Sequence, residues 1–179
     1  LRPYQREGFK WICTLARLGI GGILADDMGL GKTIQVIAYL LSRREAGERL
    51  PSLVVCPASL VYNWMSELAR FAPALSAAAV AGTREERRRT VREAGSHDVL
   101  VTSYDLLKRD IDLYERQRFH CQVLDEAQYI KNHATLAARS AKRIRADVRF
   151  ALTGTPIENR LSELWSIFDF LTPGLLGTH

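Results

Sequence analysis

Short apolar runs alternate along the chain with longer stretches in which apolar residues recur every three or four positions. The short runs end at glycine, proline or polar residues, and their length and flanks predict strands. The predicted strands are 22–25, 53–56, 99–101, 122–124 and 150–152, and helical periodicity fills 34–41, 60–68 and 157–171. Strands that alternate with helices predict an α/β fold with a mainly parallel sheet and helices on both faces.

The predicted helices differ in the face that they offer to solvent. Trp64 and Trp165 fall on apolar faces, so we expect both to pack in the core. The segment 83–94 holds five arginines and three glutamates. Its nearly balanced charge predicts an exposed helix with a solvated face.

The net charge of the chain, +5, is concentrated in one stretch. Residues 131–149 contain six basic residues and one acid, Asp147, so this stretch alone carries a charge of +5. Such a run is either a solvated helix face or a surface that contacts the phosphate backbone of a nucleic acid. The residues that adjoin the run must decide between the two.

The remaining composition narrows the class of protein. The 179 residues suit one domain, and 47% hydrophobic and 25% charged residues are typical of a globular protein. No apolar run approaches the roughly 18 residues that span a bilayer, so no membrane partner is expected. Three distant cysteines and four scattered histidines form neither a disulfide framework nor a zinc pattern, and the thiols suit a reducing compartment.

A glycine-rich segment, 26–33, follows the first predicted strand and begins a predicted helix. Backbone N–H groups there can cradle a phosphate at the helix N-terminus. Lys32 would reach the β- and γ-phosphates, and the Thr33 hydroxyl would be a ligand of Mg²⁺. The P-loop pattern asks for glycine at position 26, where this chain has aspartate. The predicted nucleotide-binding residues of this segment are Asp27, Met28, Gly29, Leu30, Gly31, Lys32 and Thr33.

An acidic pair, Asp125 and Glu126, comes directly after the apolar run 122–124. A carboxylate at a strand end beside a P-loop holds Mg²⁺, and we assign this role to Asp125. Glu126 is placed to orient or deprotonate the attacking water. Together with Lys32, these carboxylates are the predicted catalytic residues, and ATP and Mg²⁺ are the predicted cofactors.

Six blocks of sequence resemble, in order, the first RecA-like lobe of Swi/Snf-type DNA-dependent ATPases, which belong to helicase superfamily two. The blocks lie at 1–5, 26–33, 53–64, 101–104, 125–132 and 152–159. In this family the first glycine of the P-loop is commonly replaced, which accounts for Asp26. The resemblance implies a single RecA-like P-loop NTPase lobe over residues 1–179, and it implies that Gln5 reads the adenine base.

The resemblance also implies residues that couple the nucleotide state to DNA contact. The family often carries histidine at the last position of the acidic block, where this chain has Gln128, a form that resembles bacterial members. Glutamine can still donate and accept a hydrogen bond. We therefore expect Gln128 to act together with the block Thr153, Gly154 and Thr155.

A grip on the phosphate backbone of DNA is implied for six residues with hydroxyl, amide or ammonium groups. They are Ser59, Asn63, Thr102, Ser103, Lys131 and Asn132. Such groups suit phosphate oxygens, so the expected binding is independent of base sequence and sensitive to salt. The implied activity is ATP hydrolysis coupled to translocation along double-stranded DNA, which remodels or displaces DNA-bound protein.

Finally, the resemblance implies partners outside this lobe. Phosphoryl transfer uses a positive group on the transition state, and in this family that arginine belongs to a second RecA-like lobe. A second lobe does not fit in 179 residues, so we expect half of a motor, weakly active or inactive alone. A DNA-bound protein or RNA polymerase is a further expected partner, in the nucleoid region of a bacterial cytoplasm or in a nucleus.

Two alternatives stay open at the level of the sequence. The chain could be a nucleotide-inactive DNA-binding or scaffold module that has kept the fold. It could also be a lobe of an RNA helicase or of a strand-separating DNA helicase. The intact Lys32, Thr33, Asp125 and Glu126 argue against the first alternative. The blocks at Asn63-Trp64 and Ile130-Lys131-Asn132 argue against the second.

Overall fold

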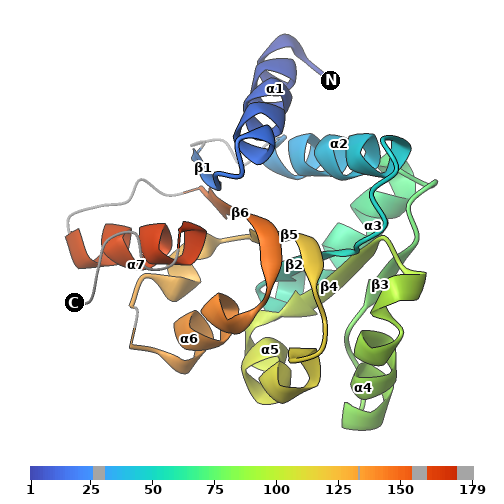
Figure 1. Cartoon of the computed structure of the whole chain (residues 1–179), viewed down its shortest axis with the longest axis vertical. Coiled ribbons are helices and arrows are strands. Elements are labelled where there is room, and N and C mark those ends of the chain that lie inside the picture. The colour runs from blue at the N-terminus through green and yellow to red at the C-terminus, as the bar shows by residue number, and fades with distance from the viewer. Residues whose placement is uncertain (26–30, 133, 155–160, 173–179) are drawn as a thin grey trace.

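The computed structural model of the chain describes residues 1–25, 31–132, 134–154 and 161–172. Within these residues, six parallel strands form one sheet in the order β1-β6-β5-β2-β4-β3 (Figure 1). The strands are β1 (Gly22–Ala25), β2 (Ser52–Cys56), β3 (Ala77–Ala79), β4 (Val99–Ser103), β5 (Phe119–Leu124) and β6 (Ala146–Thr153). The predicted α/β fold with a parallel sheet is confirmed.

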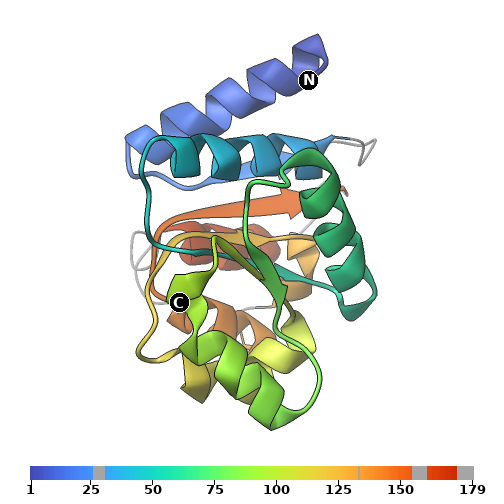
Figure 2. The same ribbon diagram turned by 90° about the vertical axis from the view of Figure 1, so that its right-hand side faces the viewer.

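Helices cover both faces of this sheet (Figures 1 and 2). One face carries α1 (Pro3–Arg17), α2 (Lys32–Glu45) and α3 (Val61–Phe71), and the other carries α4 (Arg84–Arg92), α5 (Tyr104–Asp110), α6 (Leu136–Arg143) and α7 (Leu161–Leu171). Short 3₁₀ helices lie at η1 (Ala58–Leu60), η2 (Ala94–Ser96), η3 (Ile111–Tyr114) and η4 (Ala127–Ile130). None of the helices in the described ranges is both long and apolar enough to cross a membrane.

The five predicted strands are all present, and their apolar runs follow from burial on both faces. Every residue of β2 and β4 is buried. Val54 packs with α1–α3 and its neighbour Val55 packs with α4–α7, so a strand covered on both sides has no polar alternation. β3 was not predicted; it consists of three alanines and pairs with β4 as the outermost strand on that side of the sheet.

The two predicted core tryptophans have different environments. Trp64 is 1% exposed and lies in the core beneath α3, as predicted. Trp165 is only half-buried, and the ammonium of Lys142 lies 5.4 Å from the centroid of its ring. The prediction of core packing is therefore confirmed for Trp64 alone.

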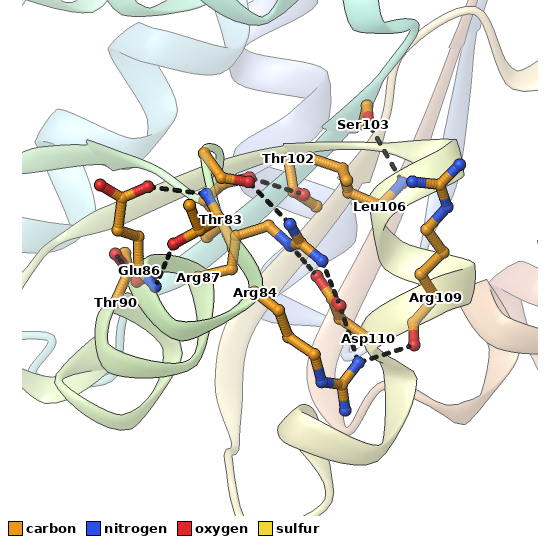
Figure 3. A network of polar contacts seen from close by, with 12 residues as sticks. Thr83, Arg84, Glu86, Arg87, Thr90, Thr102, Ser103, Leu106, Arg109 and Asp110 are labelled. Carbon is orange, nitrogen blue, oxygen red and sulfur yellow. Dashed lines mark hydrogen bonds and ion pairs between the residues drawn. The ribbon is translucent and has the colours of Figure 1, made fainter.

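The arginine-rich segment forms α4, but its face is not simply solvated. Thr83 caps the helix by accepting a hydrogen bond from the backbone N–H of Glu86. Arg87 is buried, and its guanidinium donates two hydrogen bonds to the buried carboxylate of Asp110 at the end of α5 (Figure 3). The prediction is wrong for Arg87 because a helix with balanced charge can still turn one arginine inward when a buried acid receives it.

Several residues of the basic run 131–149 contact other groups of the protein. Lys142 pairs with Asp169 on α7 at 2.9 Å, and Arg143 pairs with Glu115 at 3.3 Å. Arg149 is half-buried and donates a hydrogen bond of 2.6 Å to the carbonyl of Ile144. These contacts favour a structural role for this part of the run over a phosphate-contact surface.

Candidate nucleotide and nucleic-acid site

The parallel strands all end at one edge of the sheet, and the candidate site residues gather there. Lys32 begins α2, Thr153 ends β6, and Asp125 follows β5 directly. β1, β6 and β5 are hydrogen-bonded neighbours, so segments that are distant in sequence meet at their carboxyl ends. In open parallel sheets this edge is where ligands bind.

Gly31 joins the glycine-rich segment to α2 in a conformation that favours glycine, with φ of 108°. A Cβ atom at this position would lie 2.5 Å from Nε2 of Gln5. Gln5 is buried on α1, and its Oε1 accepts a hydrogen bond of 2.7 Å from the backbone N–H of Arg2. The fold thus packs Gln5 against the start of α2, while its role toward adenine stays a prediction.

Lys32 is the first residue of α2, and its side chain is buried. Its ammonium donates a hydrogen bond of 3.0 Å to the backbone carbonyl of Thr153. A buried ammonium is costly unless polar or anionic groups surround it. The Thr153 carbonyl at the end of β6 therefore holds the Lys32 ammonium at the carboxyl ends of the strands, where it would contact a phosphate.

Asp125 accepts three hydrogen bonds that hold its carboxylate and its backbone carbonyl. Its Oδ2 accepts from the indole N–H of Trp64 at 2.9 Å, and its Oδ1 accepts from the backbone N–H of Glu126 at 2.9 Å. Its backbone carbonyl accepts from the hydroxyl of Tyr104 at 2.7 Å. Burial raises the pKa of the Asp125 carboxyl above its ordinary value, although the hydrogen bond from Trp64 opposes this shift.

Gln128 connects the acidic pair to the end of β6. Its Nε2 donates a hydrogen bond to Oε2 of Glu126, and its Oε1 accepts one of 3.3 Å from the hydroxyl of Thr153. Glu126 itself has a φ of 51°, an unusual backbone conformation for a residue with a side chain. The structure brings Gln128 and Thr153 together as expected, Gly154 follows directly, and Thr155 lies outside the described residues.

The described part of this site fits a nucleotide that carries a divalent cation. Lys32 supplies a buried positive charge for phosphate, and Asp125 supplies an oriented carboxylate for a hard cation, which usually takes one or two carboxylates together with substrate phosphates. Thr33, the predicted hydroxyl ligand, lies half-buried on the first turn of α2. The predicted loop residues Asp27, Met28, Gly29 and Leu30 lie outside the described residues.

The predicted DNA-contacting residues divide into an exposed group and a buried group. The exposed group consists of Ser59 in η1, Asn63 on α3, and Lys131 and Asn132 after η4. These segments follow β2 and β5, so the group lies at the same edge as the nucleotide site. The Lys131 side chain is 58% exposed, with its ammonium 3.8 Å from Glu163, and Asn132 accepts a hydrogen bond from the backbone of Ala134.

Thr102 and Ser103 form the buried group, which requires a correction. The Thr102 hydroxyl donates to the carbonyl of Val80, and the Ser103 hydroxyl caps α5 by accepting from the backbone N–H of Leu106 (Figure 3). Both hydroxyls serve contacts inside the protein, so these two side chains are not available to a DNA phosphate in this structure. The residue types at a strand end do not distinguish an end that faces solvent from one that other segments cover.

Two residues of the site were not identified as such from the sequence. Trp64 was expected only in the core, yet its N–H holds the Asp125 carboxylate. Tyr104 holds the Asp125 backbone and stacks on Tyr129 with ring centroids 4.9 Å apart. Both contacts join residues more than 20 positions apart, and the only signal in the sequence was that these residues fall in the blocks 53–64 and 101–104.

One protein-family profile and several known proteins match nearly the whole chain. The profile of the SNF2-related domain matches residues 4–179. An uncharacterized ATP-dependent helicase of Mycoplasma pneumoniae is 48% identical over 178 residues, and the putative ATP-dependent helicase/translocase YwqA of Bacillus subtilis is 45% identical over 183 residues. The TATA-binding protein-associated factor MOT1 of Saccharomyces cerevisiae is 42% identical over 190 residues. Each comparison covers 99% of this chain but only 17%, 20% and 10% of the relative.

A solved structure has the same fold at a similar level of identity. The Sulfolobus solfataricus SWI2/SNF2 ATPase core in complex with double-stranded DNA superposes with a TM-score of 0.90 and 45% sequence identity. The match covers 99% of this chain and 37% of that chain. The chain therefore spans at most about a fifth of these curated relatives and somewhat more than a third of that ATPase core.

Proposed function

We propose that this chain, which belongs to the SNF2-related domain family, is the first RecA-like lobe of an ATP-driven motor that moves along double-stranded DNA. The observation that carries the proposal is the link between Lys32, Thr153, Gln128 and Glu126 at the carboxyl edge. These consecutive hydrogen bonds connect the predicted phosphate site to the acidic pair. The exposed residues Ser59, Asn63, Lys131 and Asn132 lie at the same edge.

In the proposed motor, this lobe binds ATP through its glycine-rich segment and Lys32, with Gln5 beside the base. Thr33 and Asp125 would hold Mg²⁺, which would neutralise charge on the phosphates during transfer. Glu126 is the group that would orient the attacking water, and Gln128 holds its carboxylate. Gln128 and the block Thr153, Gly154 and Thr155 would then report the state of the nucleotide to the DNA-contacting residues.

The proposed DNA contact is made by phosphate-seeking groups. The exposed Ser59, Asn63, Lys131 and Asn132 offer a hydroxyl, two amides and an ammonium, which suit phosphate oxygens and carry no base specificity. The Sulfolobus relative in complex with double-stranded DNA supports duplex DNA as the partner. We propose that the second RecA-like lobe docks on the same edge, because phosphoryl transfer uses a further positive group on the transition state, such as an arginine, in addition to the P-loop lysine.

The test is ATP turnover by the full-length protein, with Lys32→Ala as the blank. Turnover is measured with duplex DNA, single-stranded DNA, RNA and no nucleic acid. Stimulation by duplex DNA that Lys32→Ala abolishes is the expected result. Stimulation by RNA or by single strands alone would favour a strand-separating or RNA helicase, and a folded protein without turnover under any condition would favour a scaffold module.

A further inference from the structure

Trp64 connects the proposed DNA-contacting surface to the proposed metal carboxylate. It lies on the first turn of α3, directly after the exposed Asn63 and five residues after the exposed Ser59 of η1. Its indole N–H donates a hydrogen bond of 2.9 Å to Oδ2 of Asp125, 61 residues further along the chain. The first turn of α3 therefore carries Asn63, an exposed residue of the proposed DNA-contacting surface. The next residue, Trp64, is buried and contacts the acidic pair.

The position of the Trp64 ring is strongly constrained. The residue is 1% exposed and packs in the core cluster that includes Leu68 of α3 and the strands β2, β4 and β5. A ring packed to this extent has few alternative positions, so a shift at the start of α3 must move the indole N–H with it. Its polar end contacts a carboxylate, and hydrogen bonds to ionised groups are stronger than those between neutral groups.

The Asp125 side chain depends on this donor for its orientation. Oδ1 is held by the backbone N–H of Glu126, whereas Oδ2 is held by Trp64. Tyr104 fixes the backbone carbonyl but does not touch the carboxylate. Removal of the Trp64 donor would therefore free the carboxylate to rotate about its Cβ–Cγ bond, which changes the oxygen that it presents toward the phosphate site.

We propose that Trp64 is a positioning residue that transmits DNA contact at the start of α3 to the Asp125 carboxylate. DNA phosphate held by Ser59 or Asn63 would fix the first turn of α3, and this turn would set the carboxylate in the orientation that takes the metal. This inference rests on the proposed function, since it requires both a bound nucleotide and bound DNA. It assigns to α3 a second route of coupling, separate from the contact between Gln128 and Thr153.

The experiment compares two reciprocal substitutions in the full-length protein. Trp64→Phe keeps most of the apolar ring and removes the N–H donor, whereas Trp64→His keeps an N–H donor and removes ring volume. Trp165→Phe is the matched control, because Trp165 is half-buried on α7, on the opposite face of the sheet. Two quantities are measured: the Mg²⁺ concentration that half-saturates binding of a fluorescent ATP analogue, and the ratio of ATP turnover with and without duplex DNA.

We expect Mg²⁺ affinity and stimulation by DNA to decrease when the N–H donor at position 64 is removed, and to recover in part when a donor is present. Trp64→Phe should raise the half-saturating Mg²⁺ concentration about fivefold and lower the stimulation ratio about tenfold, in the range expected for the net contribution of one typical hydrogen bond. Trp64→His should recover part of both quantities, and Trp165→Phe should change neither. Asn63→Ala should lower the stimulation ratio in the wild-type background but produce little further loss beside Trp64→Phe, because coupled residues are not additive.

Other outcomes separate this inference from the proposed function. If duplex DNA stimulates the wild type and Trp64→Phe by the same factor, the inference is overturned while the motor function stands. A larger loss in Trp64→His than in Trp64→Phe would overturn it too, since packing would then be what matters. A wild type that duplex DNA does not stimulate would remove the proposed function itself. If Trp64→Phe folds poorly, replacement of Trp64 by 3-benzothienylalanine, which has sulfur in place of N–H, makes the same comparison at nearly constant volume.

Discussion

At the scale of single residues, Gly31 combines a left-handed backbone conformation with a crowded position for a side chain. Its φ of 108° strains any residue with a side chain, and Gln5 fills the space that a Cβ would need. Gly31→Ala should lower the free energy of unfolding by about 1–2 kcal/mol from the backbone conformation alone. The displacement of Gln5 should add to this cost and weaken nucleotide binding, which denaturant unfolding and a nucleotide titration will measure.

Gly47→Ala is the matched control for this substitution. Gly47 has a φ of 95°, and a Cβ there would meet no atom within 4 Å. The control therefore suffers the backbone strain without the clash, and it lies at the far end of α2 from the nucleotide site. Equal losses of stability in the two variants, with unchanged nucleotide affinity, would show that Gln5 does not buttress the start of α2.

Glu67 on α3 gives the stability of the fold a dependence on pH. One of its carboxylate oxygens is buried without a hydrogen-bond partner among the described residues, and burial, followed by the nearby Asp125 charge, raises the pKa of its carboxyl. The folded state therefore keeps this proton to a higher pH than the unfolded chain does. Since the folded state then binds more protons, stability falls as the pH rises through the window above the ordinary glutamate value of 4.5.

Glu67→Gln should remove this loss. The midpoint of thermal unfolding should match the wild type near pH 4 and exceed it at pH 8. The gain should correspond to less than about 1 kcal/mol, because the carboxylate is only partly buried and solvent screens it. Glu85→Gln, at an exposed position on α4, is the matched control for the loss of one carboxylate. A Glu67→Gln curve parallel to that of the wild type from pH 4 to 8 would contradict this account.

Sequence reasoning found the residues of this site whose chemistry is visible in one short segment. Lys32 and Thr33 follow a glycine-rich turn, and Asp125 and Glu126 follow an apolar strand, so residue types and order were enough. The Trp64–Asp125 hydrogen bond could not be found in this way, because it depends on how α3 packs against β5. The burial of Thr102 was hidden for the same reason, since a strand end does not reveal which segment covers it.

At the scale of elements, the ion pair between Arg87 and Asp110 joins α4 to α5 (Figure 3). Asp110 is 1% exposed, and its replacement would leave the Arg87 guanidinium buried without its charge partner. Asp110→Asn should therefore lower the free energy of unfolding by about 3–5 kcal/mol. Asp112→Asn is the matched control, because Asp112 also pairs with α4 through Arg84 but is 57% exposed.

The control substitution should cost at most about 1 kcal/mol, as is typical of exposed ion pairs. Urea unfolding of both variants measures the difference. If Asp110→Asn costs no more than Asp112→Asn, α4 is held by its apolar contacts, such as Val91, and the ion pair is dispensable.

Because α5 begins with Tyr104, which holds the Asp125 backbone, loss of the pair should also reduce nucleotide affinity at temperatures where the fold survives.

The same elements show how far periodicity could predict the fold. Strands buried on both faces gave continuous apolar runs, so β2, β4 and β5 were predictable from short windows. β3 was not, because Ala77–Ala79 has neither β-branched nor aromatic residues and exists through its pairing with β4. The inward turn of Arg87 was also not predictable, since its acid lies 23 residues away on another helix.

At the scale of the whole molecule, one consequence of the parallel sheet decides where DNA can bind. All strands end at one edge, so the exposed Asn63 and Lys131 lie on the same side as Lys32 and Asp125. Arg139 lies on α6, which follows Lys131 in the sequence. Together with α5 and α7, α6 covers one face of the sheet instead. We therefore expect that only the first residue of the basic run reaches DNA.

Two substitutions in the full-length protein, Lys131→Ala and Arg139→Ala, distinguish a direct contact of Lys131 with DNA phosphate from a general effect of positive charge. Both side chains are exposed, and both substitutions remove one positive charge from the same run. If the edge binds phosphate, Lys131→Ala should weaken duplex binding severalfold for every DNA sequence and reduce the slope of log affinity against log salt by about one. Arg139→Ala should leave the slope unchanged, and equal reductions in both variants would instead mean that DNA follows the face of α6.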